Sequence, residues 1–289
     1  MKDQAETLRV KLGKSTSIAK TIGIVSGKGG VGKSNVSVNF SLSLSQKGKK
    51  VLLFDLDIGM GNVHILLGGH VKKSIATFIN DFDTELNDII YDSKYGISYI
   101  SVGTGLNEMA EWDKEHIEAF LYSMQELQAR YDFIIFDMGA GASRNTLNLL
   151  MSVDDIFVVT TPETTSLTDA YSMIKFIHLK DPNKNYFLIC NRAISMKEGN
   201  ETINRLQTVG KKFLNKEMSI LGVLPEDSSV RKAVKSQIPF LLIYPRSQVS
   251  TSLLNLTNQY LLHQNGKSIF VSSERSPFFE RLRKIFLVR

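Results

Sequence analysis

A glycine-rich segment with two lysines follows the first apolar run of the sequence, and it could bind phosphate. The run 21–26 leads directly into Gly27, Lys28, Gly29, Gly30, Val31, Gly32, Lys33, Ser34 and Asn35. The first eight of these residues fit GxxxxGK[ST], in which backbone N–H groups cradle phosphate oxygens at the positive end of the next helix. Lys33 would reach the β- and γ-phosphates of a nucleotide, and the Ser34 hydroxyl would bind Mg²⁺.

The same segment also fits a second motif. Gly27, Gly29 and Gly32 satisfy GxGxxG, the fingerprint of dinucleotide-binding proteins, and acidic residues follow about 20 positions later. A dinucleotide turn has no use for an ammonium and a hydroxyl at the first helical positions, whereas a triphosphate with Mg²⁺ needs both. Lys33 and Ser34 therefore favour ATP and Mg²⁺ as cofactors, and a dinucleotide oxidoreductase is the weaker alternative.

Carboxylates stand at the ends of two further apolar runs. Asp55 ends the run 51–55 and Asp57 follows two residues later, and Asp137 ends the run 133–137. An apolar strand that ends in an acid, downstream of a phosphate loop, is typical of a Walker B strand, so we expect Asp137 to hold Mg²⁺. Ligands of open α/β sheets bind at this carboxyl edge, which suggests a role for Asp55 and Asp57 beyond the alternative of capping a turn.

Short apolar runs alternate with segments of helical length along most of the chain. The runs are 21–26, 51–55, 97–102, 133–137, 156–161, 186–191 and 220–224, and the helical segments are 33–47, 113–130, 143–151, 165–178, 198–215, 228–235 and 248–262. Continuous apolar strands separated by helices predict an α/β fold with a doubly wound, mostly parallel sheet of seven to eight strands. We expect one domain over 21–262, preceded by a separate segment 1–20 and followed by a linker and helix in 263–289.

The net charge of +6 belongs to the two ends of the chain. Residues 1–20 carry five basic and two acidic side chains, and residues 263–289 carry six and two, which leaves the body near neutrality. Basic ends on a neutral body favour contact with an anionic surface over nucleic-acid binding, which usually needs a basic folded face; solvated tails are the alternative. The single cysteine, Cys190, excludes an intrachain Cys-based metal cluster, and the chain has neither a membrane-spanning run nor a secretion signal, so we expect a cytoplasmic protein.

The additional lysine of the loop, Lys28, indicates which family of P-loop proteins the sequence resembles. Gly27–Ser34 reads GKGGVGKS, which resembles the deviant Walker A motif of the MinD/ParA ATPases, and Asp55–Gly59 is similar to their DxDxG element. The resemblance implies a P-loop NTPase that hydrolyses ATP and forms a homodimer with ATP. It also implies that Lys28 reaches the partner's phosphates, that Asp57 positions the attacking water, and that Asp55 belongs to the water shell of Mg²⁺.

Later segments resemble the parts of this family that hold adenine. They are Asn191 and Arg192 after the sixth run, and Pro225, Glu226 and Asp227 after the seventh. Ordinary turns, in which Asn and Pro are common, are the alternative. The segment 161–169 is similar to one near the dimer face of the family, without roles for single residues.

The C-terminal segment has the pattern of an amphipathic helix that begins at Ser276 and Pro277. Its apolar face, which spans an arc of about 120°, holds Phe278, Phe279, Leu282, Ile285 and Phe286, with basic residues outside it. Such a helix can lie in a membrane surface, as a similar helix does in MinD relatives. The pattern fits equally well a helix that packs against its own domain.

The N-terminus carries a second resemblance. Asp3, Gln4, Ala5, Leu8 and Arg9 are similar to the DQAxxLR element of the FlhG (YlxH) family, which controls the number and position of flagella. The resemblance implies stimulation of an FlhF-like GTPase, reversible binding to the inner face of the cell membrane, and flagellar switch proteins as further partners. A ParA-type partition ATPase acting on nucleic acid is the main alternative, and a carrier of metal clusters is a second.

Overall fold

An eight-stranded, mostly parallel sheet forms the centre of the protein. The computed structural model describes residues 18–57, 61–81, 83–101, 114–139, 144–265 and 276–287. The strands are β1 (Lys20–Val25), β2 (Val51–Leu56), β3 (Tyr91–Asp92), β4 (Ser98–Ser101), β5 (Phe133–Met138), β6 (Asp155–Thr160), β7 (Asn185–Ala193) and β8 (Ser219–Pro225). Their order is β3-β4-β2-β5-β1-β6-β7-β8, and only β3 and β4 pair antiparallel.

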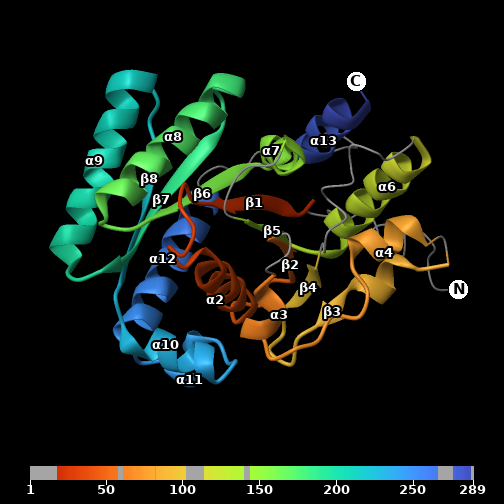
Figure 1. Cartoon of the computed structure of the whole chain (residues 1–289), viewed down its shortest axis with the longest axis horizontal. Coiled ribbons are helices and arrows are strands. Elements are labelled where there is room, and N and C mark those ends of the chain that lie inside the picture. Colours follow the sequence, from red (N-terminus) through yellow and green to blue (C-terminus); the bar gives the residue numbers. More distant parts are fainter. Residues whose placement is uncertain are drawn as a thin grey trace, which may run out of the picture.

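Helices cover both faces of this sheet (Figure 1). They are α2 (Lys33–Ser45), α3 (Val63–Leu66), α4 (Ile75–Asn80), η1 (Leu86–Ile89), α6 (Lys114–Arg130), α7 (Arg144–Ser152), α8 (Thr164–Lys180), α9 (Met196–Leu214), α10 (Ser228–Lys235), α11 (Phe240–Ile243), α12 (Gln248–Asn265) and α13 (Pro277–Leu287). The predicted α/β fold with a doubly wound sheet is confirmed. All seven predicted strands and all seven predicted helices are present, and α12 continues three residues beyond the expected domain end at 262.

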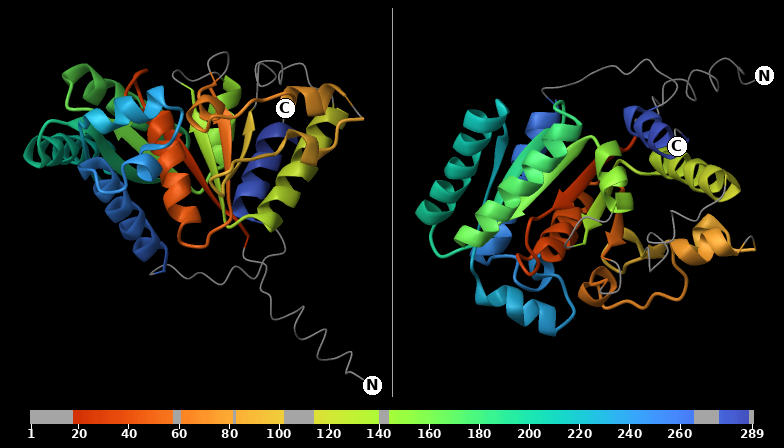
Figure 2. Two further views of the ribbon diagram at one scale, coloured as in Figure 1. Left: turned by 90° about the horizontal axis from the view of Figure 1, so that it is seen from below. Right: turned by 45° about the horizontal axis from the view of Figure 1, so that its top comes forward.

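The strands divide their side chains between two apolar clusters. In β1, Ile22 and Ile24 face the cluster formed with α2 and α12, whereas Val25 faces the cluster formed with α6, α7 and α8. Successive side chains of a strand point to opposite faces, so a strand buried on both sides must be apolar throughout. Figure 2 shows the resulting three layers, with α2 and α12 on one side of the sheet and α6 and α13 on the other.

The C-terminal helix α13 lies on the domain, where it packs against α6 and α7. Its apolar face is buried: Phe278 stacks on Phe136 of β5 with ring centroids 5.9 Å apart, and Phe286 meets Phe120 of α6 edge-on. Phe279 and Leu282 are buried in the same cluster, and Ile285 is half-buried. The structure thus contains the packed arrangement that the sequence left open as the alternative to membrane contact.

Candidate nucleotide-binding site

The loop between β1 and α2 has a backbone shape that depends on glycine. Gly30 and Gly32 have φ angles of +77° and +90°, in the left-handed region that favours glycine. A Cβ atom on Gly27 would collide with the backbone of Asp169, in the second turn of α8. Gly32 is the N-cap residue of α2 and has no side chain that could bind the first N–H groups of the helix. The loop therefore presents a helix N-terminus suited to an anion.

A buried carboxylate faces the first turns of α2 from β5. Asp137 is 1% exposed, and its Oδ1 accepts a hydrogen bond of 2.9 Å from the Ser37 hydroxyl. Burial raises the pKa of Asp137, while the ammonium of Lys33 and the hydroxyl of Ser34 act in the opposite direction. Within the described residues, Oδ2 of Asp137 has no hydrogen-bond partner.

Asp55 lies beside Asp137, because the two residues are register partners on the adjacent strands β2 and β5. It accepts hydrogen bonds from the N–H groups of Val63 at 3.0 Å and Asp57 at 3.3 Å. Burial, followed by the charge of Asp137, raises the pKa of Asp55 to about 7. The turn-capping role that the sequence left open is thus present, and it coexists with a position next to Asp137, the predicted Walker B acid.

These groups suit Mg²⁺. A buried carboxylate oxygen without a partner, two adjacent carboxylates and a serine hydroxyl form the oxygen-rich set of ligands that this ion prefers. Asp57 is half-buried at the same edge, and a Cβ on Gly139, after the Walker B strand, would lie 3.1 Å from its Oδ1. The residues predicted to hold the metal and the attacking water are therefore neighbours.

Lys28 points away from the loop that carries it. Its Nζ lies 2.9 Å from Oε2 of Glu163 and 3.2 Å from Oγ1 of Thr165, at the start of α8. Both charged side chains are exposed, with 43% and 59% of their surface accessible, and Lys28 lowers the pKa of Glu163. Sequence reasoning gave Glu163 no role of its own, because no local pattern links it to a lysine 135 positions earlier.

The predicted adenine-binding residues lie next to the loop or next to each other. The Asn191 side chain donates a 2.8 Å hydrogen bond to the carbonyl of Val31 in the phosphate loop. Arg192 pairs with Glu226 at 2.9 Å, which joins the ends of β7 and β8. Asp227 caps α10 by accepting the N–H of Ser229, so this residue has the ordinary turn role. Asn35 and Pro225 are half-buried.

The model of the ParA family, described as NUBPL iron-transfer P-loop NTPase, matches residues 17–261 of this chain. The chain belongs to the ParA family. The antiactivator FleN of Pseudomonas aeruginosa is 32% identical to this ParA-family chain over 231 residues, which cover 80% of the chain and 82% of FleN. The flagellum site-determining protein YlxH of Helicobacter pylori is 32% identical over 270 residues, 92% of the chain and 90% of YlxH.

Solved structures agree with this assignment. The septum site-determining protein MinD of Pyrococcus horikoshii, complexed with Mg-ADP, matches with a TM-score of 0.68 and 26% identity, over 87% of the chain and 100% of that structure. MinD of Aquifex aeolicus matches with a TM-score of 0.67 and 23% identity over 88% and 100%, which supports the fold. As a P-loop ATPase of the ParA family, the protein binds ATP and hydrolyses it to ADP and phosphate.

The iron-transfer description of the family model does not suit the thiols of this chain. Its single cysteine, Cys190, is fully buried in β7, and burial raises the pKa of its thiol to about 12. No cluster of three or more His, Cys, Asp or Glu residues suited to a metal occurs among the described residues. In the same part of the chain, none of the helices has the length and apolar character that crossing a bilayer requires.

Proposed function

We propose that this chain is an ATP-driven switch that regulates the placement and number of flagella. ATP joins two copies, the C-terminal helix binds the inner face of the cell membrane, and hydrolysis returns monomers to the cytoplasm. FleN and YlxH, named as an antiactivator and a flagellum site-determining protein, support the flagellar part of the proposal. Asp3, Gln4, Ala5, Leu8 and Arg9, assigned to stimulation of an FlhF-like GTPase, lie outside the described residues, and flagellar switch proteins are proposed as further partners.

In the proposed reaction, each group of site residues has a separate role in phosphoryl transfer. Loop N–H groups and Lys33 hold the phosphates, and Asn191, Arg192, Pro225, Glu226 and Asp227 surround the base. Ser34, Asp55 and Asp137 hold Mg²⁺, which supplies positive charge to the β- and γ-phosphates when bound. Asp57 orients the attacking water. Positive charge at the equatorial oxygens is the main requirement of the reaction.

The position of Lys28 is the single observation that best supports a dimer. Its ammonium is exposed at the rim of the loop and is bound to Glu163 and Thr165 rather than turned inward. An exposed ion pair of this kind contributes little stability, so a stronger anion can displace it. In a face-to-face dimer, the γ-phosphate of the ATP bound by the second copy is such an anion. Lys28 then acts in trans on that phosphate, as an arginine finger does.

Membrane binding requires α13 to leave its groove. Phe278, Phe279, Leu282 and Phe286 are buried against the domain, so the same apolar face cannot contact lipid at the same time. Arg283 and Lys284 are already exposed beside that face, and release also frees Arg281 from its ion pair with Asp154. Each basic residue near an anionic leaflet contributes about 1 kcal/mol. Because one short helix binds weakly, we expect stable attachment when a dimer presents two.

The test is cosedimentation with liposomes that contain anionic lipids. Full-length protein and a form truncated before Ser276 are each mixed with Mg-ADP or with Mg²⁺ and a nonhydrolysable ATP analogue. The proposal predicts pelleting of the full-length protein with the ATP analogue alone. Equal pelleting in all four mixtures would reject nucleotide-gated membrane binding.

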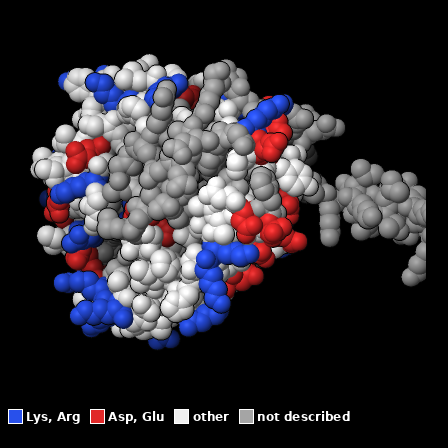
Figure 3. Space-filling view, turned by 45° about the vertical axis from the view of Figure 1, so that its right-hand side comes forward, with Lys and Arg blue, Asp and Glu red and all other residues white. Residues whose placement is uncertain are grey.

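A parallel salt titration with DNA tests the nucleic-acid alternative. Nonspecific DNA binding falls steeply with rising salt because it releases counterions. Residues 21–262 together are close to neutral, and the face shown in Figure 3 carries acidic as well as basic side chains. We therefore expect no salt-sensitive DNA binding in the range where liposome binding is seen; binding to DNA with ATP in place of lipid would favour the partition alternative.

A further inference from the structure

Ser37 is buried one helical turn beyond Lys33, between the phosphate loop and the Walker B strand. The residue has no accessible surface. Its hydroxyl lies 3.0 Å from the carbonyl oxygen of Lys33 and 2.9 Å from Oδ1 of Asp137. No sequence motif assigned a role to this residue.

The hydroxyl has one proton and two possible acceptors. An ionised carboxylate is a stronger acceptor than a neutral carbonyl, so the proton goes to Asp137 whenever that group is charged. The Lys33 carbonyl does not depend on it, since the backbone N–H of Ser37 stands in the i→i−4 position of the same helix. The Lys33 carbonyl therefore has another donor, whereas the bond to Oδ1 of Asp137 depends on the Ser37 hydroxyl.

This contact fixes the orientation of the carboxyl group. Rotation about χ2 of an aspartate is broad, so one strong bond to a chosen oxygen decides where the other oxygen points. With Oδ1 held by Ser37, Oδ2 remains buried and without a partner among the described residues. Lys33 and Ser34 both act on this carboxyl group, so they lie close to it. Asp55, the register partner of Asp137, repels the same carboxylate when both are charged.

We propose that Ser37 is a positioning residue of the ATPase, which holds the carboxylate of Asp137 so that Oδ2 faces Mg²⁺. The inference rests on the proposed metal role of Asp137. It assigns no contact with nucleotide to Ser37 itself, which acts through the aspartate.

Ser41 provides a matched control within the same helix. It is also fully buried, one turn further along, and its hydroxyl donates a 2.7 Å hydrogen bond to the carbonyl of Ser37. This is the ordinary back-bond of a serine inside a helix. Ser37 and Ser41 thus differ in the bond to Asp137, while burial, helix and backbone contact are alike.

The experiment measures the binding of a fluorescent ADP analogue with and without Mg²⁺ in Ser37→Ala, Ser41→Ala and Asp137→Asn proteins. We expect Ser37→Ala to bind the analogue normally in EDTA and to need about tenfold more Mg²⁺ for half of the Mg²⁺-dependent gain in affinity. Ser41→Ala should match the wild type. Ser37→Thr, which keeps the hydroxyl, should retain the Mg²⁺ response, and Ser37→Cys, a nearly isosteric weak donor, should lose it.

The controls separate this inference from the proposed function. A normal Mg²⁺ response in Ser37→Ala and Ser37→Cys, together with a lost response in Asp137→Asn, overturns the role of Ser37 and leaves the metal site intact. A normal response in Asp137→Asn overturns the metal role itself. Equal losses in Ser37→Ala and Ser41→Ala would show that any cavity in α2 has the same effect, and would also overturn the inference.

Discussion

Arg281 of α13 and Asp154, the residue before β6, form an ion pair of 2.7 Å that fastens the C-terminal helix to the domain. The Nε atom of the same arginine donates a 2.8 Å hydrogen bond to the carbonyl of Ser152, the last residue of α7. The other oxygen of Asp154 accepts the N–H and hydroxyl of Thr21 in β1. A basic residue suited to an anionic membrane is thus bound to the domain while α13 is docked.

Asp154→Asn should loosen α13 without changing the helix itself. The amide can still accept from Thr21, but its nitrogen would face the guanidinium of Arg281. Leaving this partly buried donor unsatisfied costs on the order of 1–3 kcal/mol, so we expect hydrogen exchange of residues 277–287 to speed up about tenfold or more. Membrane binding with ADP should rise in parallel.

Asp155→Asn is the control for this change. Asp155 is the next residue and is fully buried, but it accepts hydrogen bonds from Tyr260 and Gln264 of α12 rather than from α13. Asp155→Asn should lower the overall stability of the domain and leave hydrogen exchange in α13 slow relative to the rest of the domain.

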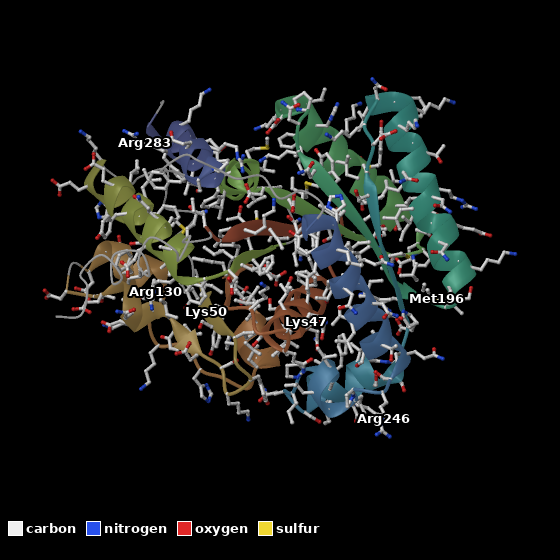
Figure 4. All side chains as sticks on the ribbon, turned by 180° about the vertical axis from the view of Figure 1, so that it is seen from behind. Lys47, Lys50, Arg130, Met196, Arg246 and Arg283 are labelled. Atoms are coloured by element: carbon white, nitrogen blue, oxygen red, sulfur yellow. The ribbon has the colours of Figure 1, made fainter. Side chains whose placement is uncertain are left out.

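Two variants of the helix itself complete the comparison. Arg281→Gln should release α13, whereas Arg283→Gln should not, since Arg283 lies on the exposed side (Figure 4). Identical hydrogen exchange of α13 in all four variants would contradict the claim that the ion pair holds α13 on the domain.

The two loop lysines should separate binding from dimerisation. Lys33 is 7% exposed at the start of α2, whereas Lys28 is bound to Glu163 outside the loop. Lys33→Ala should lose most nucleotide affinity. Lys28→Ala should bind ATP within about twofold of the wild type, because an exposed pair contributes little, and should fail to dimerise or hydrolyse. Fluorescent-nucleotide binding and phosphate release measure the two effects, and a Lys28→Ala protein that dimerises and hydrolyses normally would refute the trans role.

Asp57→Ala should slow chemistry while leaving binding intact. Asp57 is half-buried beside Gly139. Loss of a general base or water-orienting group typically costs 10²–10⁴-fold, so we expect turnover to fall by about 100-fold or more. Asp83→Ala, at an exposed position, serves as the comparison. A turnover of Asp57→Ala close to that of Asp83→Ala would assign the attacking water to another group.

Lys184 predicts a stability change at alkaline pH. Its side chain is 3% exposed and donates to the carbonyl of Val153, and burial, followed by the charge of Arg281, lowers its pKa to about 8. Between pH 8 and about 10.5 the unfolded chain holds this proton and the folded protein does not. The contribution of Lys184 to the free energy of unfolding therefore rises with pH across that window and is lowest below pH 8.

Urea unfolding of the wild type and Lys184→Met at pH 7, 8, 9 and 10 measures this contribution. The free energy of unfolding of the wild type should rise relative to that of the variant as the pH increases above 8. Arg281→Gln should move the gain to higher pH, because it removes the second cause of the lowered pKa. A stability difference that stays constant from pH 7 to 10 would contradict the assignment.

The sequence predicted those parts of the site that depend on local pattern. Continuous apolar runs identified β1, β2 and β5, and the parallel arrangement implied that Asp55 and Asp137 meet at one edge, as their register shows. The glycine motif located the loop because its backbone shape requires glycine at positions such as Gly32. The two-residue strand β3 and the short helices α3, α4 and α11 are too brief for a periodic signal.

Contacts between distant parts of the chain could not be predicted in this way. Ser37 and Asp137 are 100 residues apart, and Arg281 and Asp154 are 127 apart, so nothing local connects them. The apolar face of α13 has the same pattern whether its partner is lipid or a groove. The neighbouring helices α6 and α7 supply that groove in the structure, and no property of residues 276–289 alone distinguishes the two environments.

The central claim is that ATP joins two copies of this chain through exchanged lysines. The direct measurement is the molar mass in solution by light scattering, with saturating Mg-ATP or Mg-ADP, in the Asp57→Ala background that slows hydrolysis. The account predicts about twice the 32.4 kDa of one chain with ATP and a single chain with ADP, and a single chain in both cases once Lys28→Ala is added. A mass that stays at one chain with saturating Mg-ATP would contradict the account.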